Sequence, residues 1–409
     1  MNKHLVTLLK LLFVAALMWW AFRDVHFEDR LVHRVGPPEQ REGVREGVIA
    51  IQGAWSVDPV RYTIGADPTV HEAARGPLPD GATLDVEPGF LTYWHNLDPW
   101  LFALGALCYF VTVLISGARW WWLLRVNGTD VSLQETLRFT WIGIFFNNVV
   151  PGATGGDVIK AIYIMKRCPG HRVPVLVSVI VDRVLGLASL ALLGAVVVLF
   201  ALDGFGDIAL GIWGVIAGVG LLGVVALSRR LRQLVRLKWL LERLPQRVTH
   251  VLKLVDQAVF FYRGHRWVIV ASLLAGVLNH IVSVLSVVCI GFALGVGMPV
   301  FPYFVLIPVI NIVSAVPIAP NGWGIGEWLY GQLFGRYGAE FLVGQANAAE
   351  AMATRGVALS VLYRAHLTLW SLLGGLLVLF EKDRVTRADI EHEAELEERD
   401  DLDPRGARS

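Results

Sequence analysis

Six apolar runs, each about long enough to cross a bilayer as one helix, constrain this chain more than any other feature of its sequence. They cover residues 5–22, 99–117, 173–202, 208–228, 267–296 and 350–380. The hydrocarbon core of a bilayer requires about 20 predominantly apolar residues in helical form. Only 17% of the residues are charged, whereas soluble domains carry roughly a quarter. The sequence therefore predicts an all-α polytopic membrane protein with about six transmembrane helices.

The positions of Lys and Arg between the runs predict their orientation. Residues 229–253 carry eight Lys or Arg and one acid, so this segment is expected to be cytoplasmic. Residues 23–98 carry seven arginines and thirteen acids, as an exported loop would. These assignments predict a multi-pass protein of the cell (inner) membrane with both termini cytoplasmic. Trp120, Trp121 and Trp122 resemble an interfacial belt at one end of the second run.

Two further apolar stretches, residues 136–166 and 301–336, are interrupted in the middle. The first contains PGATGGD at 151–157 and the second PNGWGIGE at 320–327. Each half is too short to cross a bilayer, and the flanking charges require each stretch to return to the side it entered from. We therefore expect two re-entrant helical hairpins, whose irregular tips must be buried in protein or line a wet cavity.

The order of these segments predicts an inverted repeat. One span, a hairpin from the cytoplasm and another span are followed by the same three elements in the opposite orientation. Both interruptions run from a proline through glycines to an acid at the start of a half-helix. Broken segments at matching places in two halves of a chain indicate a transport site at their interface. A site between the two hairpins is therefore expected.

Four motifs carry a resemblance to a known family. They are NNVVPGATGGDVIKA (147–161), VDRVLGL (181–187), PIAPNGWGIGE (317–327) and YRAHLTLW (363–370). Over roughly residues 98–380 the chain resembles the flippase-like domain family, named after the transmembrane region of lysylphosphatidylglycerol synthases. The resemblance implies a protein that moves aminoacylated phospholipid or prenyl-linked glycolipid between leaflets.

The expected function is transport of a lipid or lipid-linked intermediate, with an anionic phospholipid or prenyl-linked glycolipid as the membrane partner. An envelope component is an expected partner of the exported insert. Two other classes stay open: a membrane enzyme or subunit of lipid or glycolipid transfer, and a structural membrane protein that binds the envelope. The apolar segments hold no Ser/His/Asp order, DxD or HExxH motif, so we expect no catalytic residues, cofactor or metal. The net charge of +1 gives no reason to expect nucleic acid.

The candidate substrate-binding residues are the helix breakers and the ionic side chains within apolar segments. The hairpins contribute Pro151, Gly152, Gly155, Gly156, Asp157, Lys160, Pro320, Gly322, Gly324, Gly326 and Glu327, and the spans contribute Asp182, Arg183, Arg355 and Arg364. An ionised side chain inside a span is costly and needs a partner. We therefore expect Arg183 and Arg364 to meet Asp157 and Glu327, where a lipid phosphate could replace either acid. An ion-pair network that only locks the hairpins is the competing interpretation.

The remaining segments complete the predicted domain organisation. Short alternating runs within residues 47–96 predict a small β-rich extracytoplasmic insert that starts near Pro37 and Pro38. The expected domains are an anchor helix (1–22), the insert (23–97), the flippase-like domain (98–380) and a disordered, acid-rich cytoplasmic tail (381–409). Residues 238–262 predict an interfacial helix.

Overall fold

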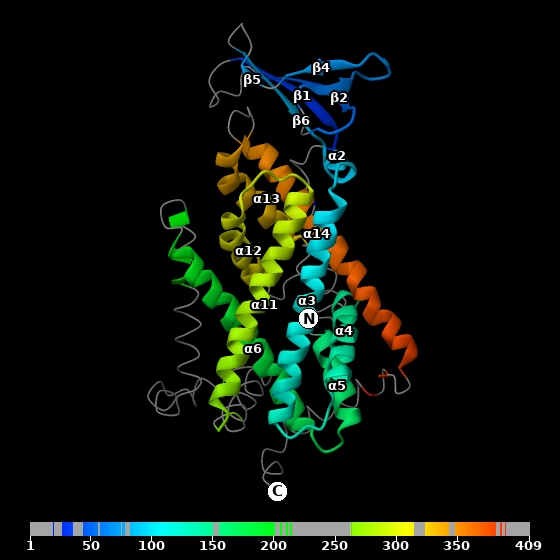
Figure 1. The fold of residues 1–409 in the computed structure, drawn as a ribbon, viewed down its shortest axis with the longest axis vertical. Coiled ribbons are helices and arrows are strands. Elements are labelled where there is room, and N and C mark those ends of the chain that lie inside the picture. Colours follow the sequence, from blue (N-terminus) through cyan, green and yellow to red (C-terminus); the bar gives the residue numbers. More distant parts are fainter. Residues whose placement is uncertain are drawn as a thin grey trace, which may run out of the picture. The chain divides into compact units, whose positions relative to one another are not determined.

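The computed structural model describes residues 19, 27–35, 44–55, 58–74, 76–77, 82–149, 155–200, 205–206, 210–211, 213–214, 262, 264–314, 324–342, 348–381, 385–386 and 389. The chain divides into two compact units, each formed by two segments. Unit 1 comprises Met1–Tyr109 with Ser283–Leu367, and unit 2 comprises Phe110–Val282 with Thr368–Ser409. Figure 1 labels the helices and strands along the chain.

Four of the described helices are long and apolar enough to cross a membrane. They are α3 (Pro99–Val126), α6 (Arg172–Val198), α11 (Arg266–Ala293) and α14 (Ala348–Phe380). Four of the six predicted runs are thereby confirmed as helices of spanning length. The other two runs, 5–22 and 208–228, lie almost entirely outside the described residues, as does the predicted interfacial helix at 238–262.

Two shorter helices, α4 (Leu133–Val149) and α5 (Gly155–Arg167), pack along each other within unit 2. The sequence explains where α4 begins: the Ser132 N–H donates to the Glu135 carboxylate and the Glu135 N–H donates to Ser132 Oγ, which is a capping box. Glu135 also accepts a hydrogen bond from Arg167 Nε, at 2.7 Å. This bond joins the first turn of α4 to the last residue of α5, so the two helices form an antiparallel hairpin. The Arg167 hydrogen bond and the backbone N–H of Ser132 lower the pKa of Glu135 to about 2.

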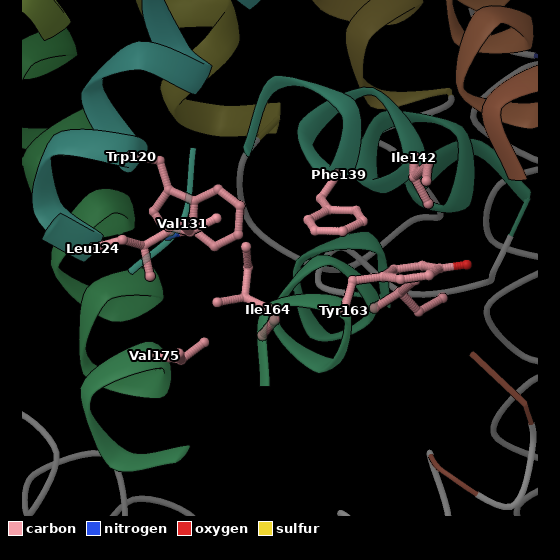
Figure 2. Close-up of a cluster of buried hydrophobic side chains, with 10 residues drawn as sticks. Trp120, Leu124, Val131, Phe139, Ile142, Tyr163, Ile164 and Val175 are labelled. Carbon is pink, nitrogen blue, oxygen red and sulfur yellow. The ribbon is translucent and has the colours of Figure 1, made fainter. Parts of the chain in front are cut away.

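Glycines allow the helices of unit 2 to approach closely. A Cβ on Gly156 of α5 would overlap the carbonyl oxygen of Gly143 on α4, and a Cβ on Gly374 of α14 would overlap the carbonyl of Trp141. Around these crossings a buried apolar core forms (Figure 2). Its members are Trp120, Leu124, Val131, Phe139, Ile142, Ile159, Ala161, Tyr163, Ile164 and Val175.

A second pair of short helices, α12 (Val300–Ser314) and α13 (Ile325–Gly338), packs together within unit 1 and is followed by the 3-10 turn η3 (Ala339–Phe341). Tyr303 of α12 meets Phe334 of α13 edge to face, with ring centroids 5.6 Å apart, and both rings are fully buried. The interrupted stretches at 136–166 and 301–336 thus each form two packed half-helices, as predicted.

The insert in unit 1 forms a six-stranded antiparallel sheet of order β4-β3-β2-β1-β6-β5. Its strands are β1 (Asp29–Val35), β2 (Val44–Ile51), β3 (Val60–Thr63), β4 (His71–Ala73), β5 (Gly76–Pro77) and β6 (Ala82–Glu87). One face buries a small core of Ile49, Val60, Tyr62, Ala73 and Val86. A small antiparallel sheet is therefore confirmed.

Two details of the predicted insert were wrong. Strand β1 precedes Pro37 and Pro38, which were expected to mark the start of the domain. The apolar end of the last predicted strand instead forms the short helix α2 (Phe90–His95). Its buried residues Phe90 and Tyr93 lie three positions apart, so one helical face carries both, and Phe90 packs on Val357 of α14.

The close approach at Gly374 leads to a stability prediction. Ala is the better helix former by about 1 kcal/mol, but its methyl group would overlap the Trp141 carbonyl, and overpacking costs about 1–3 kcal/mol. We expect Gly374→Ala to lower the melting temperature in detergent, measured by thermal unfolding. The control is Gly211→Ala, since a Cβ at Gly211 meets nothing within 4 Å. Equal melting temperatures for the two variants would contradict this packing.

Candidate functional site

Asp157 is the third residue of α5 and is 7% exposed. The glycine before it, Gly156, donates its N–H to Asn147 Oδ1 of α4 at 2.9 Å. The Asn147 side chain therefore satisfies one of the helix's first N–H groups, which have no partner within the helix. A carboxylate in the first turn also interacts favourably with the positive end of the helix dipole. Local sequence thus explains why α5 starts here with its acid buried.

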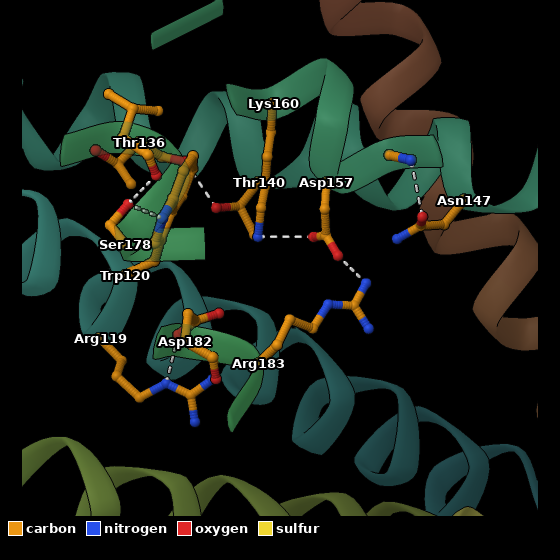
Figure 3. Close-up of polar contacts among 12 residues, drawn as sticks. Arg119, Trp120, Thr136, Thr140, Asn147, Asp157, Lys160, Ser178, Asp182 and Arg183 are labelled. Carbon is orange, nitrogen blue, oxygen red and sulfur yellow. Dashed lines mark hydrogen bonds and ion pairs between the residues drawn. The ribbon is translucent and has the colours of Figure 1, made fainter. Parts of the chain in front are cut away.

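Two cations bind the Asp157 carboxylate (Figure 3). Lys160 Nζ lies 2.9 Å from Oδ1, one turn along the same helix, and Arg183 Nη2 of α6 contacts Oδ2. The Lys160 ammonium also sits over the ring of Trp120, 4.4 Å from its centroid. A desolvated cation–π contact of this kind contributes about 2 kcal/mol. Lys160 is therefore held by a carboxylate and an aromatic face at once.

A second buried ion pair lies in the same unit. Arg119 of α3 donates from Nε to Asp182 Oδ1 at 2.8 Å and from Nη2 to the Asp182 carbonyl at 3.3 Å. Both side chains are less than 10% exposed. Adjacent helical positions point about 100° apart, which is why Asp182 and Arg183 turn to different partners. The prediction that these two residues need not pair with each other is confirmed.

Unit 1 holds a comparable site on α13. Glu327 is fully buried, accepts the N–H of Gly324 at 2.6 Å and forms an ion pair with Arg364 of α14. Gly324 has a φ of +83°, a conformation open to glycine at little cost. A Cβ on Gly326 would overlap the Arg364 guanidinium, so glycine is needed there for the arginine to reach the acid.

Arg355 lies on α14 but has different partners from Arg364. Its guanidinium donates to Tyr93 Oη and to the Val296 carbonyl, both at 3.0 Å. It also lies over the ring of Trp55, 5.0 Å from the centroid. The two arginines therefore do not share a face, as their spacing of nine residues predicts. Arg355 connects the insert to the turn that follows α11.

The structure brings together eight of the fifteen predicted site residues, as two groups of four. Each group consists of an ion pair and the residues that contact it: Gly156, Asp157, Lys160 and Arg183 in unit 2, and Gly324, Gly326, Glu327 and Arg364 in unit 1. Gly155 begins α5, while Asp182 and Arg355 have the separate partners given above. Pro151, Gly152, Pro320 and Gly322 lie outside the described residues.

The sequence interpretation missed Arg119 and was wrong about Trp120. Arg119 is not among the candidate site residues, and Trp120 is predicted to belong to an interfacial belt. The structure buries both, with Trp120 1% exposed and its Nε1 donating to Ser178 Oγ at 3.1 Å. Because α3 runs to Val126, nine residues past the predicted end of its span, both positions lie inside the helix. The intramembrane acid Asp182 was the available signal, since it required a cation.

Comparison with known proteins places this chain in a family. A sequence model of the lysylphosphatidylglycerol synthase TM region matches residues 88–378, which is well over half of the chain. The chain belongs to the lysylphosphatidylglycerol synthase TM region family. With its four candidate spans, this family member is a multi-pass membrane protein.

A curated relative of this family member is a UPF0104 membrane protein of Pyrococcus horikoshii. The two are 37% identical over 101 residues, covering 24% of this chain and 30% of the relative. The match thus spans about a third of the relative's length. No solved structure matches the chain.

The Arg119–Asp182 pair generates a prediction about stability. Arg119→Gln leaves Asp182 as a buried carboxylate without its arginine, and breaking a buried pair costs about 3–5 kcal/mol. We expect a large fall in the melting temperature of the detergent-solubilised protein. Adding Asp182→Asn should recover most of the loss, because the remaining pair is neutral. A double variant no more stable than Arg119→Gln would rule out the ion pair as the cause.

Proposed function

We propose that this protein transports a lipid or lipid-linked intermediate, binding its anionic headgroup at the acid–base sites on the α4–α5 and α12–α13 hairpins. The membrane partner is an anionic phospholipid or prenyl-linked glycolipid in the cell membrane. The observation that carries the proposal is that two cations bind Asp157 while one of them, Arg183, remains about half exposed. The family's description, which names a lysylphosphatidylglycerol synthase, supports a lipid as the class of substrate.

The hairpins are proposed to enter the membrane and return without crossing it. The helices α4 and α5 have 17 and 13 residues, fewer than the about 20 that a bilayer core requires. The Glu135–Arg167 bond holds the outer ends of both helices together, so the chain leaves the hairpin where it entered. In the full proposal the chain has six transmembrane helices and both termini are cytoplasmic. Four of these helices and the two hairpins form an inverted repeat.

An exchange of anions at Arg183 would allow binding and release. The ion pairs of Asp157 and Asp182 combine these two carboxylates with three cations, Arg119, Lys160 and Arg183. This excess of positive charge favours one further anion. The Asp157 side chain is 10% exposed and that of Arg183 is 48% exposed. A phosphodiester can therefore approach the arginine, while Lys160 keeps Asp157 neutralised when Arg183 turns to the substrate.

Removing Arg183 tests the proposed function. We expect Arg183→Ala to slow movement of a labelled anionic lipid about tenfold or more, because a hydrogen bond to a charged group contributes about 1.5–3 kcal/mol. The measurement uses purified protein in vesicles without any soluble donor. Arg125→Ala is the control, since Arg125 is an exposed arginine paired with Asp130.

A purely structural role for the pair gives a different result. Arg183→Ala would then destabilise the protein, and Arg183→Ala with Asp157→Asn would restore stability together with normal lipid movement. That outcome would exclude Arg183 as a substrate contact.

The proposed return of the α4–α5 hairpin makes a topological prediction. Residues 128 and 169 lie in the turns before α4 and after α5. Single cysteines placed at these two positions, with the native cysteines replaced, should react with a membrane-impermeant maleimide from the same side of the membrane. Labelling from opposite sides would show that the segment between them crosses the bilayer.

A further inference from the structure

The chain returns to the α4–α5 hairpin after α14 ends at Phe380. Glu381 pairs with Arg138 of α4, with Oε2 and Nε 3.3 Å apart, and Asp389 pairs with Lys166 of α5, with Oδ2 and Nζ 2.7 Å apart. Between these two ion pairs, the N–H of Val385 donates to Tyr163 Oη at 3.4 Å. We call the described residues Glu381, Val385, Thr386 and Asp389 the strap.

The strap also has an apolar anchor and a fixed acid. Val385 packs against the buried core of unit 2 that contains Tyr163. The Thr386 N–H donates to Asp389 Oδ2 at 2.7 Å and the Asp389 N–H donates to Thr386 Oγ1 at 3.3 Å, and this reciprocal pair of hydrogen bonds orients the carboxylate. The hydrogen bond from Lys166, followed by those from Thr386, lowers the pKa of Asp389 to about 2. Asp389 is therefore ionised throughout the neutral range.

The strap covers a cationic surface on the hairpin. Arg138 is near the start of α4 and Lys166 near the end of α5, so both lie at the end of the hairpin where Glu135 and Arg167 pair. With the strap in place, the side chains of Arg138 and Lys166 are 40% and 34% exposed. Two carboxylates thus neutralise two cations at the base of the same hairpin that carries Asp157.

We propose that Arg138 and Lys166 form a surface that binds the phosphate of an anionic lipid headgroup. The strap occupies this surface with the carboxylates of Glu381 and Asp389. The strap competes with the lipid for this surface and limits its access to the hairpin. The strap holds two negative charges at two separate cations. This arrangement resembles the several charges of a lipid surface more than the single site of a small anion. The inference rests on the proposed function, since it assigns an access surface for the same class of substrate.

The test uses the full chain with Glu381→Gln and Asp389→Asn together. Asparagine keeps a side-chain oxygen that can accept the Thr386 N–H while it removes the charge. Binding is titrated with detergent micelles that contain phosphatidylglycerol, with micelles that contain phosphatidylcholine and with inorganic phosphate. Hydrogen–deuterium exchange of residues 163–167 reports separately whether the strap has been released. Asp130→Asn, which removes an exposed ion pair elsewhere in unit 2, is the matched control.

We expect faster exchange at residues 163–167 and phosphatidylglycerol binding about threefold tighter or more, as the loss of two partly exposed ion pairs allows. Phosphatidylcholine and inorganic phosphate binding should not change. Adding Arg138→Gln and Lys166→Gln should abolish the gain. Unchanged exchange, unchanged phosphatidylglycerol binding or an equal gain for inorganic phosphate would each overturn the proposal. These measurements involve no lipid transport, so failure of the proposed function would be seen separately.

Discussion

A carboxylate buried in an apolar helix bundle must have a cation beside it, and this requirement shapes much of the described structure. Water cannot solvate the charge, and an isolated ion in such a place is too costly to keep. Asp157, Asp182 and Glu327 are each paired with an arginine from a helix of spanning length. The pairs with Asp157 and Glu327 therefore also fix the short half-helices to the long ones.

The two hairpins pair their buried acid with a cation in the same way. In α5 and in α13 the acid is the third residue of the helix and a glycine is the second, and the arginine comes from the next long helix along the chain. This correspondence is stronger support for a repeat than the sequence motifs, which share little beyond proline, glycine and an acid. The sites differ in charge: Asp157 has Lys160 as a second cation, whereas Glu327 has the Gly324 N–H. The Asp157 site should therefore attract an anion more strongly.

The sequence predicted those features that depend on segment hydropathy and on the scarcity of intramembrane charge. Apolar runs identified α3, α6, α11 and α14, and the few ionic residues within apolar segments predicted that Arg183 and Arg364 meet Asp157 and Glu327. Which arginine pairs with which acid came from the structure. Arg119 was missed because a cation near the end of an apolar run is indistinguishable from an interfacial flank until the helix length is known. Strand β1 was missed because the two prolines at 37 and 38 were read as the start of the β-rich segment, whereas the alternation of polar and apolar residues begins before them.

The strap shows that amino-acid composition alone does not predict which residues of a polar segment make ordered contacts. Residues 381–409 contain eleven acids and few apolar residues, a composition that predicts disorder. A single apolar residue, Val385, and two acids at the right distances are enough to place the described residues of this segment on unit 2. The composition of a segment is an average over all its residues, whereas the contacts that hold the segment in place depend on single residues at particular positions.

The position of Val385 also matters for anyone attaching a reporter to this protein. Val385 packs against the core of unit 2, as do Leu377 and Val378, so the apolar packing on this core continues past the end of α14. A fluorescent protein joined directly after Phe380 would remove an apolar contact and two ion pairs at once. A reporter joined beyond Asp389 would keep all three, and its signal would then describe the native hairpin.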